Sequence, residues 1–104
     1  MLQSTSTPQV SMHLSEVEYD EPTKIAIHLF NCAKRFLNPH GGSLQILPAI
    51  KCLYMALSMV LAPQIEVELR LLLGNVLLDH TQNFNDALEQ IRKAHQLAES
   101  VRPI

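Results

Sequence analysis

The sequence predicts an all-α fold of about four helices that pair into two antiparallel hairpins. Apolar residues recur every three or four positions through most of residues 22–101, a spacing that places them on one face of an α-helix. Runs rich in Pro, Gly, Asn and Ser interrupt this pattern and indicate where helices end. A pattern of alanines also returns along the chain. We expect one hairpin at residues 22–60 and the other at residues 64–101.

The segment before the first helix differs in composition. Residues 1–21 contain Ser, Thr, Gln and Pro, followed by an acidic cluster, and show no fixed apolar period. Such a segment has too little apolar surface to order itself by burial. We therefore expect residues 1–21 to form a flexible acidic leader and residues 22–104 to form the helical region.

The first helix is expected from near Pro22 to near Leu37. Asp20 is suited to cap it, and proline is tolerated in the first turn of a helix. Its apolar face is predicted to carry Ile25, Leu29, Ala33 and Phe36. Residues 38–42 cannot continue a helix and supply the left-handed conformations that a reversal needs.

The second helix begins at Ser43 or at Leu47, and the sequence leaves both starts open, because Ser43 and Pro48 each occur at helix starts. We expect it to stop before Pro63. Its apolar face is predicted to carry Ala49, Leu53, Ala56, Leu57 and Val60.

The third helix is expected from about Gln64 to His80, with apolar side chains on more than one side. So broad an apolar surface predicts burial against more than one neighbour. Its members are Ile65, Leu69, Leu72, Leu73, Val76 and Leu77.

The fourth helix is expected to follow a polar turn at residues 81–85, with Asn85 or Asp86 as its cap, and to run to about Val101. The apolar residues that carry it are Ala87, Leu88, Ile91, Ala94, Leu97 and Ala98.

A small-large-small pattern occurs in both the second and the fourth helix. Its members are Ala49, Leu53 and Ala56, then Ala87, Ile91 and Ala94, an offset of 87 minus 49, or 38 residues. Ile50 matches Leu88 and Met59 matches Leu97 at the same offset. Alanine at a helix crossing lets two backbones approach, while the large residue fills the space one turn on. The repeat therefore favours stacked hairpins of the tetratricopeptide (TPR) type.

The helix before each alanine pattern supports the same interpretation. The residues that match the first helix of a TPR unit are Leu73, Gly74 and Leu77, with Cys32, Ala33 and Phe36 as the weaker counterpart. In such a unit the glycine lies at the close contact with the partner helix. Gly74 to Ala87 spans 13 residues, against about 12 in the usual motif, so a lengthened turn is expected. The alternative is an antiparallel four-helix bundle around one centre.

Composition argues against catalysis and against most ligands. A net charge of −2, with eight scattered Lys and Arg and only three Phe and two Tyr, does not favour direct nucleic-acid binding. The chain shows no secretory signal and no run suited to a membrane span. Motifs for a hydrolytic nucleophile or a phosphate-binding loop are lacking in the sequence. We predict no enzyme, no catalytic residue, no cofactor and no small-molecule ligand.

Cysteine and histidine do not form a metal motif. His28 and Cys32 lie one turn apart on a helix, but two ligands do not make a site, and no pair has zinc-finger spacing. Cys32 and Cys52 lie within apolar helical patterns, which predicts reduced thiols buried in the packing of an intracellular protein. No metal site is predicted.

Several short segments in the second half of the chain carry a family resemblance. They are Pro48-Ala49-Ile50-Lys51-Cys52-Leu53, Glu66-Val67-Glu68-Leu69-Arg70-Leu71, Leu73-Gly74 with Val76-Leu77, His80-Thr81 with Asn83, and Ala87 with Lys93-Ala94. Together they resemble the TPR subunit of the cohesin-loading complex, the smaller loader subunit of the Mau-2 or sister-chromatid cohesion type. The likeness covers about residues 46–100 and is strongest from Glu66 to Ala94.

The resemblance implies a non-catalytic helical scaffold that wraps the extended N-terminal segment of the large HEAT-repeat loader subunit. Through that partner it implies indirect contact with cohesin and chromatin, and a role in sister-chromatid cohesion and chromosome partition in mitosis. It also implies a nuclear location, with the cytoplasm as a second compartment. Members of the family are several times longer, so we expect this chain to be their N-terminal part.

The residues expected to face a bound segment lie on the third helix. They are Leu71, Leu72, Asn75 and Leu78, and packing within the array is an equally good interpretation of each leucine. A TPR carboxylate clamp is similar in that Asn75 follows Gly74, but it needs a lysine where this chain has Leu71. The alternatives are a generic TPR adaptor of the cochaperone or transport type and a small self-associating bundle.

Overall fold

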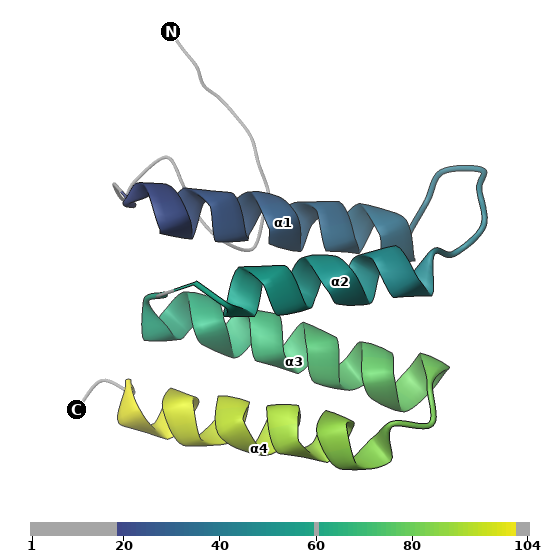
Figure 1. The fold of residues 1–104 in the computed structure, drawn as a ribbon. Coiled ribbons are helices and arrows are strands. Elements are labelled where there is room, and N and C mark those ends of the chain that lie inside the picture. Colours follow the sequence, from purple (N-terminus) through teal and green to yellow (C-terminus); the bar gives the residue numbers. More distant parts are fainter. Residues whose placement is uncertain (1–18, 60, 102–104) are drawn as a thin grey trace, which may run out of the picture.

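The computed structural model describes residues 19–59 and 61–101. Within these ranges it contains four helices and no strand, α1 (Glu21–Leu37), α2 (Ile46–Leu57), α3 (Pro63–His80) and α4 (Phe84–Ser100) (Figure 1). The predicted all-α class and the number of helices are confirmed. Most of the predicted leader, residues 1–18, lies outside the described residues.

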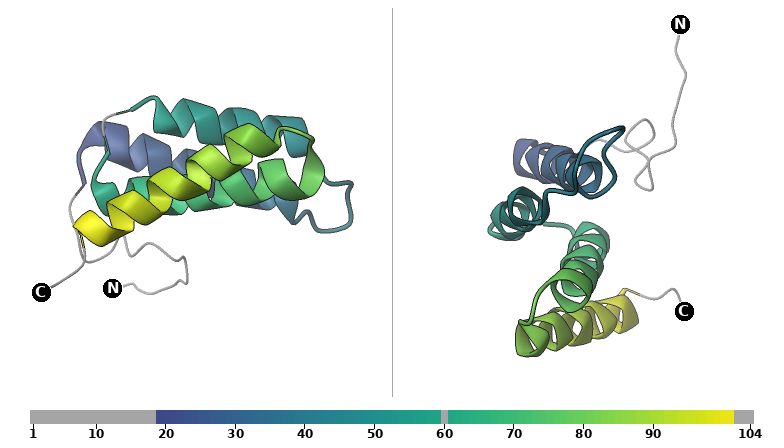
Figure 2. Two further views of the ribbon diagram at one scale, coloured as in Figure 1. Left: turned by 90° about the horizontal axis from the view of Figure 1, so that it is seen from below. Right: turned by 90° about the vertical axis from the view of Figure 1, so that its right-hand side faces the viewer.

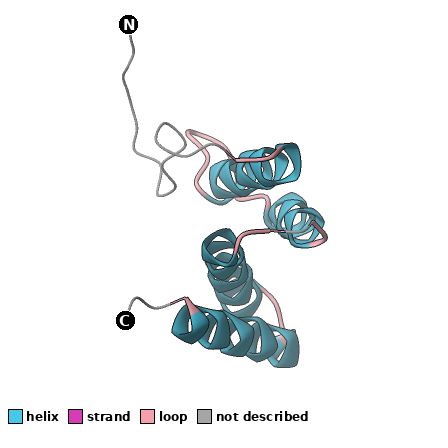
Figure 3. Cartoon of the chain, turned by 90° about the vertical axis from the view of Figure 1, so that its left-hand side faces the viewer, coloured by secondary structure: helices cyan, strands magenta, loops and turns pink. Residues whose placement is uncertain are grey.

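The four helices form two stacked hairpins and not a bundle around one centre. α1 packs on α2 and α3 packs on α4, while α3 also contacts α2 and, to a smaller extent, α1. Of the helices in the described ranges, α4 contacts α3 alone. Viewed end-on, α1 and α4 lie at opposite ends of a staggered row (Figure 2 and Figure 3). A closed bundle brings its first and last helices together, so that alternative does not describe this arrangement.

α1 begins and ends where its sequence predicts. The Asp20 carboxylate accepts a hydrogen bond from the Thr23 N–H at 3.0 Å, and hydrogen bonding from the Thr23 side chain and backbone lowers the pKa of Asp20. Beyond Leu37, Gly41 adopts a φ of +76°, a left-handed conformation that glycine takes without strain. Local capping and turn chemistry therefore set both ends of this helix.

The buried face of α1 is not the predicted one. Ile25 is 45% exposed, Leu29 and Phe36 are half-buried, and only Ala33 of that stripe is fully buried. The other buried residues are Thr23, Ala26, Ile27 and Phe30. The helix thus carries two overlapping apolar stripes. The stripe that contains both Ala26 and Ala33 faces the core, because small residues allow close approach of the neighbouring backbone.

α2 begins at Ile46, beside the later of the two predicted starts, and Pro48 lies in its first turn. The three residues of its small-large-small pattern, Ala49, Leu53 and Ala56, are each 0% exposed. Leu57 is half-buried, and Val60 lies outside the described residues.

α3 is buried on two sides, as its broad apolar surface predicts. Its buried residues are Ile65, Leu69, Leu73, Gly74, Val76 and Leu77. Gly74 faces α4, whereas Ile65 and Leu69 lie on another side of the helix and join the core shared with the first hairpin. The helix thus connects the two hairpins.

α4 begins at Phe84, with Asn83 at the N-cap position, so the predicted cap at Asn85 or Asp86 is wrong. The Thr81 hydroxyl donates to the Leu77 carbonyl at 2.5 Å and accepts from the Asn83 N–H at 3.0 Å. These two bonds close the turn within residues 81–83, which lets the helix start earlier.

The predicted apolar face of α4 is buried only in part. Ala87 and Ala94 are buried, and Ile91 and Leu97 are half-buried. The residues of that face that are exposed are Leu88 and Ala98. They are exposed because, among the described helices, α4 has α3 as its one neighbour.

The tightest crossing joins α3 to α4 at Gly74. A Cβ added there would lie 2.5 Å from Cγ1 of Ile91 and 3.1 Å from the carbonyl oxygen of Ala87. Neither distance is one that a real Cβ keeps without movement of its neighbours. An alanine here would have to displace the Ile91 side chain and widen the contact with Ala87, so glycine suits the crossing that the TPR pattern predicts.

We expect Gly74→Ala to destabilise the chain because the new methyl group displaces Ile91. Overpacking costs about 1–3 kcal/mol, and the higher helix propensity of alanine returns about 1 kcal/mol. A net loss of about 1 kcal/mol lowers Tm by roughly 4–8 °C in a domain of this size. Urea and thermal unfolding followed by circular dichroism measure both quantities.

Two further variants test the cause. In an Ile91→Ala background the obstructing side chain is gone, so Gly74→Ala is expected to cost less there than in the native chain. Asn75→Ala changes the exposed neighbour on the same helix and is expected to alter the free energy of unfolding by less than about 0.5 kcal/mol. An equal cost of Gly74→Ala in both backgrounds would contradict this account.

Candidate partner-binding surface

Exposed leucines of α3 flank the Gly74 crossing. Leu71 lies three residues before Gly74 and Leu78 four residues after it, so the three share one side of the helix. Leu71 is 36% exposed and Leu78 is 41% exposed. Apolar surface therefore remains open along the edge of α3 that adjoins α4.

α4 continues this apolar surface across the seam between the two helices. Ile91 contacts the Gly74 position, and Leu88 and Phe84 precede Ile91 by one and two turns on the same side. Leu88 is 59% exposed and Phe84 is 51% exposed. The four exposed residues, Leu71, Leu78, Phe84 and Leu88, are here called the hairpin-2 apolar face.

The first hairpin carries an equivalent face, where two positions are buried and the other two, Leu37 and Ile46, are half-buried against the same core. At the 38-residue offset of the repeat, Leu88 corresponds to Ile50, which is 9% exposed. On the preceding helices Leu71 corresponds to Phe30, which is 4% exposed. Both Ile50 and Phe30 belong to the core that α3 completes. The second hairpin thus repeats the surface by which the first hairpin packs on its neighbour, and in the described ranges this copy stays uncovered.

The structure separates the residues that the sequence predicts as partner-facing. Three of them, Leu71, Asn75 and Leu78, are exposed on α3. Leu72 is half-buried and packs against the core, so its contacts lie within the array. Sequence reasoning missed Phe84 as a site residue because it fell in the predicted turn, and Leu88 because it was assigned to a buried stripe.

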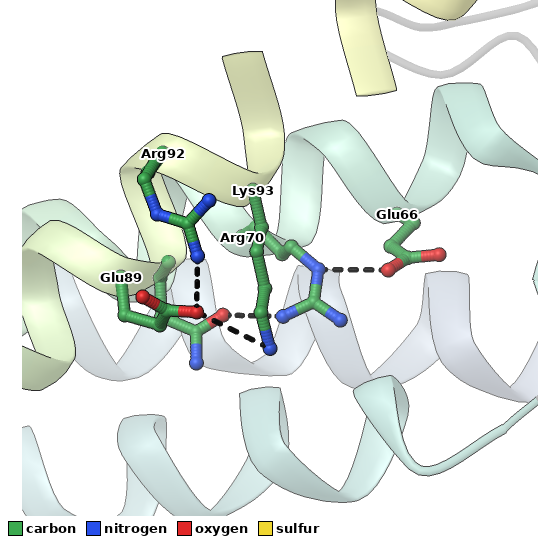
Figure 4. A network of polar contacts seen from close by, with 6 residues as sticks. Glu66, Arg70, Glu89, Arg92 and Lys93 are labelled. Carbon is green, nitrogen blue, oxygen red and sulfur yellow. Dashed lines mark hydrogen bonds and ion pairs between the residues drawn. The ribbon is translucent and has the colours of Figure 1, made fainter. Parts of the chain in front are cut away.

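The other side of the seam between α3 and α4 is polar (Figure 4). The Arg70 Nε donates to the Glu66 carboxylate at 2.7 Å, and a second guanidinium nitrogen donates to the Gln90 side-chain oxygen at 2.6 Å. Gln90 belongs to α4, so Arg70 joins the two helices through its side chain. Its side chain is 17% exposed, which makes this link better ordered than a surface ion pair.

Among the described residues, cysteine and histidine side chains approach each other only at His28 and Cys32. His28 Nε2 lies 3.5 Å from Cys32 Sγ, to which Arg35 also donates a hydrogen bond at 3.3 Å. Within residues 19–59 and 61–101, no three metal-ligating side chains gather. Both cysteines are free, but they are half-buried rather than buried as predicted. Cys52 packs at the margin of the core, and its partial burial raises the pKa of its thiol.

Comparison with known proteins identifies one family. The cohesin loading factor family matches residues 46–104, more than half of the chain. The matched region begins with α2 and includes the Gly74 crossing, the hairpin-2 apolar face and the polar side of the seam. No curated protein and no solved structure matches the chain. In the part of the chain that the structure describes, no helix has the length and apolar character that crossing a bilayer requires.

We expect the hairpin-2 apolar face to make the isolated chain self-associate, since clustered exposed apolar side chains drive association. Leu88→Gln removes the most exposed member of that face. Sedimentation velocity should then shift toward the monomer, while the free energy of unfolding changes by no more than about 0.5 kcal/mol.

Leu47→Gln is the matched control, because Leu47 is a leucine of α2 that is 66% exposed and lies outside the hairpin-2 apolar face. Its sedimentation is expected to follow that of the native chain. If Leu47→Gln and Leu88→Gln act equally, association does not depend on this face.

Proposed function

Because the chain belongs to the cohesin loading factor family, we propose that it forms part of the TPR-type small subunit of the cohesin loader, of the Mau-2 or sister-chromatid cohesion type. In this role it binds the N-terminal segment of the large HEAT-repeat loader subunit. It thereby supports cohesin loading onto chromatin, sister-chromatid cohesion and chromosome partition in mitosis. Its place of action is the nucleus, on chromatin, with a cytoplasmic pool.

The observation that carries this proposal is the exposed hairpin-2 apolar face within the family-matched region. Stacked helix hairpins bind partner segments through surfaces of this kind, since an extended or helical peptide can bury such side chains. The family is one of loading factors without catalysis, which is in keeping with a binding surface as the functional site. The chain acts as a scaffold.

The size of the face sets how much of the partner it holds. Full burial of a large apolar side chain contributes about 1.5–3 kcal/mol. The four side chains are already partly covered, so burying the remainder contributes roughly 2–5 kcal/mol in total. A micromolar complex needs about 8 kcal/mol. The partner segment is therefore expected to extend past this face and to make further contacts.

A carboxylate clamp, as in a cochaperone-type TPR adaptor, is not favoured. The place where that clamp needs a lysine holds Leu71, and this side chain is apolar and exposed. With leucine at the lysine position, the site favours an apolar ligand and lacks the cation that a terminal carboxylate requires.

The binding test uses the full chain and a labelled peptide from the N-terminal segment of the large HEAT-repeat subunit. We expect saturable binding by fluorescence anisotropy, and we expect Leu71→Gln and Leu78→Gln each to weaken Kd by about fivefold, equivalent to about 1 kcal/mol. Leu47→Gln, outside the face, is expected to leave Kd unchanged.

The possible outcomes distinguish an error in the partner from an error in the surface that binds it. If the peptide binds the full-length small subunit but not this chain, the partner assignment for this chain is lost. If the peptide binds and both leucine variants bind equally well, the partner is correct and the hairpin-2 apolar face is not where it lies.

A further inference from the structure

An open cavity of about 410 Å³ lies between α3 and α4 on the polar side of their seam. Its lining residues are Glu66, Arg70, Lys93, Gln96, Leu97 and Ser100. Lys93 is five residues from Leu88, or about 140° around an α-helix, so the cavity and the hairpin-2 apolar face open in different directions. The two surfaces can therefore be tested separately.

Arg70 supplies a fixed cation to this cavity. Its two side-chain hydrogen bonds, to Glu66 and to Gln90, use two of the five N–H donors of a guanidinium. The remaining N–H donors can bind a ligand. Because the guanidinium is already held in place, ligand binding does not have to order it. Glu66 neutralises the charge of Arg70, so Arg70 contributes hydrogen-bond donors at fixed positions rather than net positive charge.

Lys93 and Arg92 share one carboxylate, that of Glu89, so two positive charges face one negative charge beside the cavity. The Glu89 carboxylate accepts a hydrogen bond of 2.6 Å from Arg92 and forms a longer ion pair, of 3.7 Å, with the Lys93 ammonium. The Arg92 contact lowers the pKa of Glu89. The Lys93 ammonium and the Arg70 guanidinium extend toward the same region (Figure 4).

We propose that this cavity binds the carboxylate of a glutamate or aspartate side chain in an extended segment of a protein partner. The carboxylate lies between Lys93 and Arg70, where it accepts charge-assisted hydrogen bonds. Leu97 offers an apolar contact to the residue beside the acid, and the Gln96 amide reaches the peptide backbone. Lining charges of Arg70, Lys93 and Glu66 sum to one positive charge, which suits a carboxylate better than a doubly charged phosphate.

The inference does not rest on the proposed function, because it uses only the lining residues and their charges. The probe is the peptide acetyl-Gly-Leu-Glu-Glu-Leu-Gly-amide, added at millimolar concentration to the ¹⁵N-labelled full chain. The neutral comparison replaces both glutamates by glutamine. A third peptide keeps the glutamines and carries a free C-terminal carboxylate.

We expect the acidic peptide to shift the amide signals of Lys93, Gln96 and Leu97 and to bind about threefold to tenfold more tightly than the neutral one. Lys93→Gln should remove this preference. Lys51→Gln, an exposed lysine on α2 outside the cavity, is the matched control and should keep it.

Each of the following results would overturn the proposal. Equal shifts from the acidic and neutral peptides, or none from either, would show that the cavity does not select an acid. A preference that survives Lys93→Gln, or that Lys51→Gln also removes, would show general attraction to basic side chains. Stronger binding of the peptide with the free C-terminal carboxylate would assign the cavity to a chain terminus instead of a side chain.

Discussion

Close approach of helix backbones at small residues is the constraint on which this structure depends. At Gly74 the two helices of the second hairpin come so near that a methyl group would meet Ile91 and the Ala87 carbonyl. In the first hairpin, Ala33 takes the position of Gly74 and Ala49 that of Ala87, and both are 0% exposed. Because each hairpin is closed by its own crossing, the hairpins join through a second face, where α3 packs mainly on α2. Within the described residues, stacking by that face leaves a copy of it open on the second hairpin.

The helices were predictable from the sequence because their ends are determined locally. Asp20 caps α1, Pro63 starts α3, and Gly41 turns the chain between the first two helices. The inward face of α1 was not predictable, because both of its stripes are apolar and the choice between them depends on how closely the neighbouring helix approaches the small residues Ala26 and Ala33. The start of α4 was missed for a related reason, since the Thr81 hydroxyl spans two backbone groups in a bond pattern that composition does not specify.

The binding surface shows the same division between local and non-local information. Periodicity identifies Leu88 as a residue suited to burial, and the repeat equates it with Ile50. Whether such a residue is buried depends on a neighbouring helix, and the values of 59% and 9% exposure record that difference. The link from Arg70 to Gln90 was likewise beyond sequence reasoning, because it depends on the register of two antiparallel helices.

The two sides of the seam between α3 and α4 contribute differently to recognition. The leucines and the phenylalanine of the hairpin-2 apolar face can bury any apolar segment, and the water released contributes binding free energy. This contribution depends little on the orientation or register of the bound segment. An exposed ion pair contributes at most about 1 kcal/mol, yet a carboxylate held between Lys93 and Arg70 fixes the register of a chain, since a shift of one residue leaves it unpaired. A partner that contacts both sides is therefore bound by the first and positioned by the second.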